Sequence, residues 1–248
     1  MKYKIIGDNL QVVNVELSEG ESVYSEAGRL VYKSENVEME AEVKGGFTEA
    51  IKRVLTRESF FVTKFTCKKG TGLVGFAGDL PGKIKVISLP ANESFITERG
   101  AFLCAEMSVT IDFEFAKIGA AFFGGEGFIL QKLNGPGNVF IHAVGDLIEY
   151  DLKANESIQV ATSHIVGFDS TVDYDVQRAG DIKTVLFGGQ GILLARLTGP
   201  GRVVLQSMTK EKMSAELGIP PKAALAAGIG AGIGAKVGGE IIKGMLKR

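Results

Sequence analysis

Short motifs recur along this chain at a nearly constant spacing. The tetrapeptide Ala-Asn-Glu-Ser at 91–94 reappears at 154–157, an offset of 63 residues. The motif Phe-Gly-Gly-Glu-Gly at 123–127 reappears as Phe-Gly-Gly-Gln-Gly at 187–191, an offset of 64 residues. A repeating unit usually cannot bury its apolar face alone and must stack on its neighbours. The repetition therefore predicts one compact body that is built from tandem units.

A fainter first copy precedes these two. Glu21-Ser22 aligns with Glu93-Ser94 at an offset of 72, whereas Pro81 aligns with Pro136 at an offset of 55. On this alignment the first copy carries 17 additional residues. Each unit has about 55 to 65 residues, a size at which a domain alone is only marginally stable. The predicted division places one β repeat in each of residues 1–90, 91–152 and 153–208, followed by a C-terminal tail at 209–248.

Apolar and polar side chains alternate through most of the first 208 residues, as in Val13-Val15-Leu17 and Val172-Tyr174-Val176. This period is typical of half-buried antiparallel strands. Pro-Gly turns interrupt the alternation at 81–82, 136–137 and 200–201. Proline presets φ in such a turn, and the following glycine tolerates a positive φ. Evenly spaced short strands of this kind favour an all-β fold of sandwiches or barrels over a wound α/β sheet.

One segment of the first copy has helical periodicity instead. Apolar residues recur at helical spacing between Phe47 and Leu55, and Thr48 is a candidate N-cap. The sequence therefore predicts one inserted helix near 47–57. This helix packs on the side of the β body or makes a subunit contact, and the pattern leaves both alternatives open.

The last 40 residues have a different character. Ala223 to Ala235 runs thirteen residues without a charge, fewer than the about 20 apolar residues that span a bilayer. Because glycine weakens an isolated helix, the tail is predicted to be helical only when it is packed. Three alternatives remain open: a flexible or self-packing tail, contact with a membrane or membrane protein, and packing between copies of the chain. The candidate contact residues are a small-residue ridge and two basic side chains, namely Gly230, Gly234, Gly238, Lys243 and Lys247.

Composition and the start of the chain bound its class and location. Lys plus Arg is 28 against 29 acidic residues, so the chain has no overall basic field of the kind that attracts nucleic acid. Cys67 and Cys104 are too few for a disulfide framework and lack metal-ligand spacing, which favours a reducing intracellular compartment. The opening Met-Lys-Tyr-Lys leads at once into strand pattern without a secretory signal or transit peptide, so we expect a cytoplasmic protein.

No motif gives positive support for catalysis. A Gly-x-Ser-x-Gly elbow is absent from the sequence. Residues 68–72 have the composition of a phosphate loop without its spacing, and they are predicted to form a solvated turn. His142 aligns with Gln206 in its sister copy. His164 aligns with Ala101, and both alignments indicate filler positions rather than metal ligands. We therefore expect a protein without catalytic, metal or cofactor-binding residues.

Glu21, Glu93 and Glu156 recur in the three copies, and each is followed by serine. Two interpretations remain open. Three equivalent carboxylates could line a shared pocket, or each Glu-Ser pair could close a strand-connecting turn through hydrogen bonds between side chain and backbone. We favour the turn.

The paired glycine motifs, the Leu-x-Gly-Pro-Gly motifs at 133–137 and 197–201 and the Gly/Ala-rich tail resemble one family. It is the widespread prokaryotic family related to the altered-inheritance-of-mitochondria protein numbered twenty-four. The resemblance implies short double-stranded β-helix repeats, similar to the fold of the tryptophan RNA-binding attenuator protein (TRAP), and assembly into a ring such as a trimer. It carries no catalytic residues over. Mitochondrial relatives are implicated in organising the inner membrane, whereas the strand pattern at the start of this sequence leads us to expect no transit peptide.

The sequence therefore predicts a non-enzymatic scaffold or interaction protein. We expect it to form homo-oligomers and to touch a membrane or membrane protein through residues 222–248. Two alternatives belong to other classes. One is a nucleic-acid binder, by analogy with the attenuator fold alone. The other is a protein that binds a small molecule between its repeats.

Overall fold

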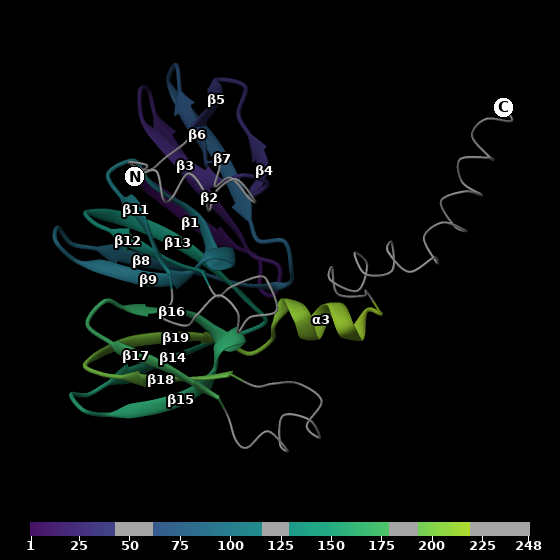
Figure 1. Cartoon of the computed structure of the whole chain (residues 1–248). Helices are drawn as coiled ribbons and strands as arrows, with labels where there is room; N and C mark the ends of the chain where they lie inside the picture. Colours follow the sequence, from purple (N-terminus) through teal and green to yellow (C-terminus); the bar gives the residue numbers. More distant parts are fainter. Residues whose placement is uncertain (43–61, 116–128, 179–192, 219–248) are drawn as a thin grey trace, which may run out of the picture. The chain divides into compact units, whose positions relative to one another are not determined.

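The computed structural model describes residues 1–42, 62–115, 129–178 and 193–218 (Figure 1). The chain divides into two compact units, Met1–Ser207 and Met208–Arg248, and the described strands belong to the first. These strands form several antiparallel sheets, which confirms the prediction of a mostly β protein.

The strands follow one another at short intervals. In chain order they are β1 (Lys2–Ile6), β2 (Val12–Ser18), β3 (Ser22–Glu26), β4 (Leu30–Lys33), β5 (Val37–Glu42), β6 (Val62–Cys67), β7 (Thr71–Ala77), β8 (Gly82–Leu89), β9 (Ser94–Glu98), β10 (Phe102–Glu106), β11 (Thr110–Phe115), β12 (Ile129–Asn134), β13 (Gly137–Val144), β14 (Leu147–Leu152), β15 (Ser157–Ala161), β16 (Ile165–Asp169), β17 (Asp173–Arg178), β18 (Leu193–Thr198) and β19 (Gly201–Gln206). The short 3₁₀ helices η1 (Arg99–Ala101) and η3 (Thr162–His164) and the helix α3 (Lys210–Glu216) complete the described elements.

Within the described residues, the strands pair into four antiparallel sheets. Their orders are β1-β2-β7-β4, β5-β6-β3-β10-β13-β8, β11-β12-β9-β16-β19-β14 and β15-β18-β17. Each strand of the third sheet comes six strands later in the chain than the strand in the same place of the second sheet. The same step relates β2-β7-β4 to β8-β13-β10, and β11-β12-β9 to β17-β18-β15. We call β2 to β7, β8 to β13 and β14 to β19 the first, second and third strand groups.

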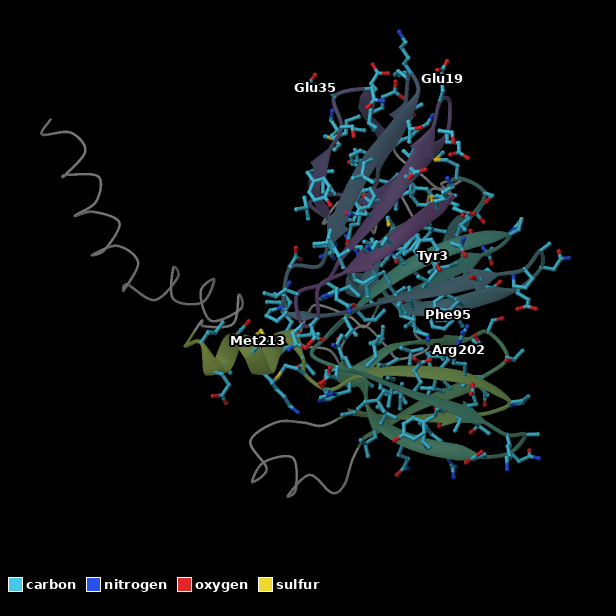
Figure 2. The ribbon with its side chains drawn as sticks, turned by 180° about the vertical axis from the view of Figure 1, so that it is seen from behind. Tyr3, Glu19, Glu35, Phe95, Arg202 and Met213 are labelled. Atoms are coloured by element: carbon cyan, nitrogen blue, oxygen red, sulfur yellow. The ribbon has the colours of Figure 1, made fainter. Side chains whose placement is uncertain are left out.

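Neighbouring strand groups are joined by one strand pair each. β3 of the first group pairs with β10 of the second, and β9 of the second group pairs with β16 of the third. We call these two strand pairs the junctions. A side-chain contact supports the second junction, because the guanidinium carbon of Arg202 on β19 lies 5.6 Å from the centre of the Phe95 ring on β9 (Figure 2).

The apolar faces that the alternation predicts are buried. Val13, Val15 and Leu17 of β2 have no exposed surface, and their neighbours along the strand are partly exposed. Strands at the junctions are buried on both faces instead, since three consecutive residues of β3 are buried. One of them, Tyr24, donates a hydrogen bond from its hydroxyl to the carbonyl oxygen of Val109 at 3.0 Å.

The recurring glutamates close turns. Oε2 of Glu21 accepts a hydrogen bond from the backbone N–H of Ser18 at 2.7 Å, and Oε2 of Glu156 accepts one from Lys153 at 2.9 Å. In the turn that contains Glu93, Pro90 takes the place of Ser18 and Lys153, and proline has no N–H to donate. The turn interpretation is therefore confirmed at Glu21 and Glu156.

The serine after each glutamate makes the same cross-strand contact in all three strand groups. Each bonds a polar side chain on the paired strand, joining Ser22 to Thr66 at 2.8 Å, Ser94 to Asn134 at 2.7 Å and Ser157 to Thr198 at 2.8 Å. These bonds mark corresponding places on β3, β9 and β15.

The aligned prolines occupy different places. Pro136 and Pro200 lie in the turns that lead into β13 and β19, whereas Pro81 leads into β8. In strand order β13 corresponds to β7, and the turn before β7 contains Gly70 with a φ of 65°. The alignment of Pro81 with Pro136 is therefore wrong, because a Pro-Gly dipeptide marks a turn without marking which turn. By strand pairing, the groups span residues 12–77, 82–144 and 147–206, so the boundaries predicted after 90 and 152 fall one strand later.

The second unit contains the helix α3, which lies at the start of the tail that was predicted to be helical when packed. α3 begins after Thr209, whose Oγ1 accepts a hydrogen bond from the backbone N–H of Lys212 at 3.2 Å. A threonine N-cap was the available start signal. The remaining tail and the predicted helix near 47–57 lie outside the described residues. Each helix in the described part of the chain is too short or too polar to cross a membrane.

Candidate functional site

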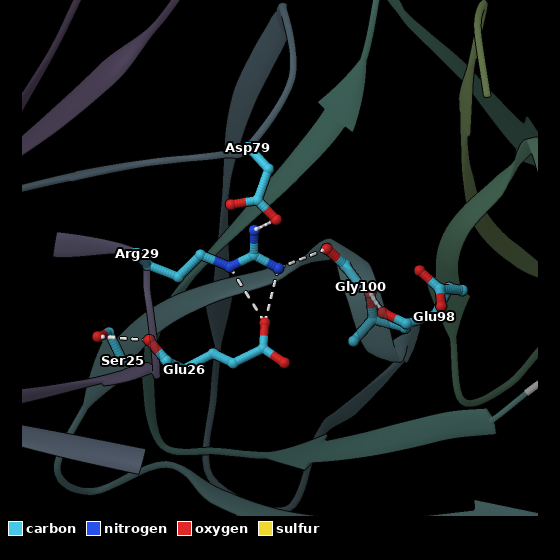
Figure 3. Close-up of polar contacts among 7 residues, drawn as sticks. Ser25, Glu26, Arg29, Asp79, Glu98 and Gly100 are labelled. Carbon is cyan, nitrogen blue, oxygen red and sulfur yellow. Dashed lines mark hydrogen bonds and ion pairs between the residues drawn. The ribbon is translucent and has the colours of Figure 1, made fainter. Parts of the chain in front are cut away.

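A buried arginine lies between the first and second strand groups. Arg29, in the connection between β3 and β4, is 8% exposed. Its Nε and Nη2 atoms donate to Oε2 of Glu26 at 3.1 and 2.6 Å, and Nη2 also donates to the carbonyl oxygen of Gly100 at 3.1 Å. Nη1 lies 2.8 Å from Oδ2 of Asp79 (Figure 3). The cluster therefore joins β3, the connection between β7 and β8, and η1.

The two carboxylates of this cluster have different surroundings. Burial raises the pKa of Glu26, and the adjacent positive charge of Arg29 opposes that shift. The Asp79 side chain is 63% exposed, and exposed ion pairs stabilise a fold little. The pair between Arg29 and Glu26 is consequently the contact on which the stability of the cluster depends.

His142 of β13 borders the same cluster and is 7% exposed. Burial lowers the pKa of His142, and the positive charge of Arg29 lowers it further. A hydrogen bond with the Leu80 backbone and the charge of Asp79 oppose this shift. The ring packs so closely on the connection between β7 and β8 that a Cβ atom on Gly78 would lie 2.4 Å from it. The fold thus favours the neutral imidazole.

The cluster has the contacts of a structural clamp rather than of an anion-binding site. Each of the three guanidinium nitrogens of Arg29 already has a partner within the chain. An arginine that binds a carboxylate or phosphate ligand presents a pair of donors to it. The contact from Arg29 to Gly100 instead joins the first strand group to the second. Sequence reasoning missed these residues, and the spacing of Glu26 and Arg29 was the only local signal.

The histidines occupy the places that the repeat alignment gave them. Ile141 and Leu205 pair with the first residues of β10 and β16, so the following residues, His142 and Gln206, correspond. Nδ1 of His164 lies 2.7 Å from the carbonyl oxygen of Gln206. Each histidine therefore has a structural partner, as its interpretation as a filler position predicted.

The other sequence-level candidates lie apart from the Arg29 cluster. Residues 68–72 include the turn between β6 and β7 and are exposed up to Thr71, which confirms the solvated turn. Cys67 and Cys104 are buried free thiols, and burial raises the pKa of Cys104. Throughout the described ranges, no three His, Cys, Asp or Glu side chains gather closely enough to hold a metal ion.

The predicted contact residues of the tail lie outside the described residues and stay predictions. They are Gly230, Gly234, Gly238, Lys243 and Lys247.

β4 and β15 are much less buried than the strands that hold the corresponding places in the other strand groups. Four of the five residues of β10 and of β16 are buried, whereas three of the four residues of β4 are exposed. The three central residues of β3 and β9 are buried, whereas no residue of β15 is buried. The sheet orders give the reason, since in the described part of the chain no strand pairs with the outer side of β4 or β15. We call these two unpaired sides the terminal edges.

The terminal edges present apolar side chains. Val31 and Tyr32 of β4 are 53% and 40% exposed. On β15, Ile158 and Val160 are half-buried. Edge strands of soluble proteins are commonly protected by charge, proline, a bulge or a covering element, because an open edge is a template for another strand. The terminal edges are therefore the candidate interaction site.

The described sheets define a mostly β protein in which β4 and β15 each lie at the end of a sheet. A profile of the family described as mitochondrial biogenesis AIM24 matches residues 3–208, and the chain belongs to this family. The family resemblance predicted from the glycine motifs is confirmed.

Two relatives from Streptococcus pyogenes match most of the chain. An uncharacterised protein of serotype M6 is 26% identical over 214 residues, which cover 83% of this chain and 85% of that protein. The crystal structure of a Streptococcus pyogenes protein has a TM-score of 0.71 and 23% identity, and the match covers 87% of this chain and 97% of that one. The second likeness supports the fold. The likeness to the attenuator protein stays a prediction.

Replacing Arg29 by methionine is expected to destabilise the protein by about 3 kcal/mol, because the buried Glu26 carboxylate loses its cation. The double variant Arg29→Met, Glu26→Gln should recover part of this loss. Urea unfolding measures both. Lys2→Met is the matched control, since Lys2 is 84% exposed in its pair with Glu16 and should change stability by less than about 1 kcal/mol. Equal losses for Arg29→Met and Lys2→Met would contradict the clamp.

The variant His142→Gln tests the pH dependence of stability at the same cluster. Glutamine is chosen because Gln206 holds the corresponding place in the third strand group. The folded state holds the pKa of His142 below its usual value of 6.5, so below that pH the unfolded chain takes up a proton that the folded chain resists. Stability from this group is therefore complete above pH 6.5 and is lost on acidification. The variant should lose less stability than the parent between pH 7.5 and pH 5.5, about one unit to either side of that value.

Urea midpoints at the two pH values give the comparison. The raised pKa of Glu26 acts in the opposite direction, favouring the folded state in acid, and it is common to both proteins. Parallel losses in parent and variant would show that His142 does not carry the effect.

Proposed function

We propose that this protein is a non-enzymatic scaffold that assembles with itself through its terminal edges. The observation that carries the proposal is the contrast in burial between β4 and β15 and their counterparts at the junctions. Strands in the same places of the sheet order are buried when a strand of a neighbouring group pairs with them. Another copy of the chain offers the same kind of neighbour to the terminal edges.

The order of the strands supports this proposal. Three successive strand groups use the same order, and within the described residues one strand pair joins each group to the next in a shared six-stranded sheet. Stacked units of this type need capping at both ends of the series, because each unit is stabilised largely by its neighbours. In its finer form, the fold prediction is a chain of three tandem units. In the proposed scaffold, the units of successive copies stack into a longer series.

The geometry of such an assembly is head to tail. β4 and β15 are different surfaces, so their association is heterologous, and a heterologous contact closes into a ring or extends as a filament. The family resemblance favours the ring. A trimer is one such ring, and the strand order is compatible with other numbers.

We further propose that residues 222–248 contact a membrane surface. Three glycines at intervals of four residues allow close packing, and Lys243 and Lys247 supply positive charge near the end of the chain. Each basic residue near an anionic bilayer contributes about 1 kcal/mol of attraction.

Sedimentation equilibrium at micromolar concentration tests self-assembly. We expect particles whose mass is a multiple of the 26.4 kDa chain. A chain shortened to residues 1–218 should assemble to the same number of copies, because the terminal edges belong to the first compact unit. A 26.4 kDa particle for the full chain would overturn the proposal. If the full chain assembles and residues 1–218 do not, the contact between copies is made by the tail and not by the terminal edges.

Co-sedimentation with lipid vesicles tests the membrane contact separately. The full chain should bind vesicles that contain an anionic lipid more strongly than neutral vesicles, and residues 1–218 should bind neither. Equal binding of the two proteins to the vesicles would contradict the proposed membrane contact and would not affect the proposed self-assembly.

A further inference from the structure

We propose that β4 of one copy of this chain pairs with β15 of a second copy as antiparallel neighbours, in the register that the two junctions use. The inference rests on the proposed self-assembly. It adds which strands pair, which residues face one another and which edge of one copy meets which edge of the next. A second copy of the chain is the one occupant proposed for both terminal edges.

The two junctions share one pairing pattern. At the first junction, Cys104, Ala105 and Glu106 face Ser25, Tyr24 and Val23 in that order. At the second junction, Gly167, Phe168 and Asp169 face Thr97, Ile96 and Phe95. In both cases the strand that follows a 3₁₀ helix pairs with the strand that follows a Glu-Ser turn. The chain therefore contains two examples of the contact from which a third can be derived.

A register shift fixes the place of β4 in this pattern. The pairing with the neighbouring strand shifts at the same point on all three strands, between Leu30 and Tyr32 on β4, between Phe102 and Cys104 on β10, and between Ile165 and Gly167 on β16. Tyr32 therefore takes the place of Cys104 and Gly167. Val31, one residue earlier, takes the place of Leu103, which has no exposed surface.

Cross-strand hydrogen bonds fix the place of β15. Ser157 bonds Thr198 as Ser94 bonds Asn134, so Ser157 and Ser94 hold the same place. Val160 lies three residues after Ser157 and therefore takes the place of Thr97. Ile158 takes the place of Phe95, which is fully buried at the second junction.

The two assignments give one register for the contact between copies. Tyr32, Lys33 and Ser34 of one copy face Val160, Gln159 and Ile158 of the next. The pairing satisfies backbone groups on both open edges and removes Val31, Tyr32 and Ile158 from water. These side chains are exposed or half-buried in the single chain, whereas their counterparts at the junctions are buried.

The sheet order also distinguishes this contact from a two-fold one. At both junctions β10 and β16 pair with β3 and β9, and neither pairs with a strand of its own type. A β4 to β4 or a β15 to β15 contact would need a register that the described part of the chain does not contain. Head-to-tail pairing uses both edges and repeats a contact that already holds the chain together.

Disulfide trapping tests the register. Lys33→Cys and Gln159→Cys replace exposed residues that the register places opposite each other, at a separation that a disulfide can bridge. Mixing the two single variants under mild oxidation should give covalent dimers, and the double variant should give a ladder of larger covalent products. The natural Cys67 and Cys104 are fully buried and need no replacement.

The control moves one cysteine out of register. Glu35→Cys lies two residues from Lys33 and is also exposed, and with Gln159→Cys it should give at most about a tenth of the covalent dimer. Dimers from Lys33→Cys alone or from Gln159→Cys alone would show two-fold pairing and overturn the inference. So would equal trapping by Lys33→Cys and Glu35→Cys.

A charge at the edge gives a second readout that needs no cysteine. Val31→Lys should weaken association at least about tenfold, since the contact would bury an unpaired charge. Met39→Lys is the matched control, because Met39 is 51% exposed on β5, whose place in the order is an edge in every strand group. An assembled particle that is insensitive to Val31→Lys and untrapped by the cysteines would refute the register and leave the proposed self-assembly intact. A monomeric parent would refute both.

Discussion

The junctions, where a strand of one group pairs with a strand of the next to complete a six-stranded sheet, are the constraint on which the rest of the structure depends. Each junction is a short antiparallel pair, β3 with β10 and β9 with β16, buried on both faces. Among the described strands, no pair between these two places of the sheet order forms within one strand group. The Arg29 cluster supports the first junction through Gly100, and Arg202 lies over Phe95 at the second. The same contacts therefore hold neighbouring strand groups together and set the direction in which they follow one another within the chain.

The same constraint explains why the two ends of the series are unlike. β1 pairs with the outer side of β2 and so extends the first sheet, a role that no described strand plays beside β8 or β14. β4 and β15 have no such neighbour among the described strands, although their counterparts do. A burial pattern is set by neighbours, so a strand in the same place of the sheet order stays exposed when no described strand pairs with its outer side.

Part of this fold was predictable from the sequence, and the failures have a physical cause. The alternation on β2, the solvated turn at 68–72 and the closure of turns by Glu21 and Glu156 depend on residues that are close in the chain. The proline alignment failed because Pro81 and Pro136 mark different turns. The candidate site was missed for a related reason: no local pattern in β4 or β15 shows that the neighbouring strand is absent.

The sequence by itself determined where the strands and their turns lie, because periodicity and turn chemistry act over a few residues. It also determined the family, through glycine motifs that recur at fixed offsets. The tertiary structure alone decided which strands meet, that Arg29 would reach a carbonyl 71 residues away, and which edges remain open. Those outcomes depend on how segments that are distant in the chain pack together, because burial and strand register exist only in the folded chain.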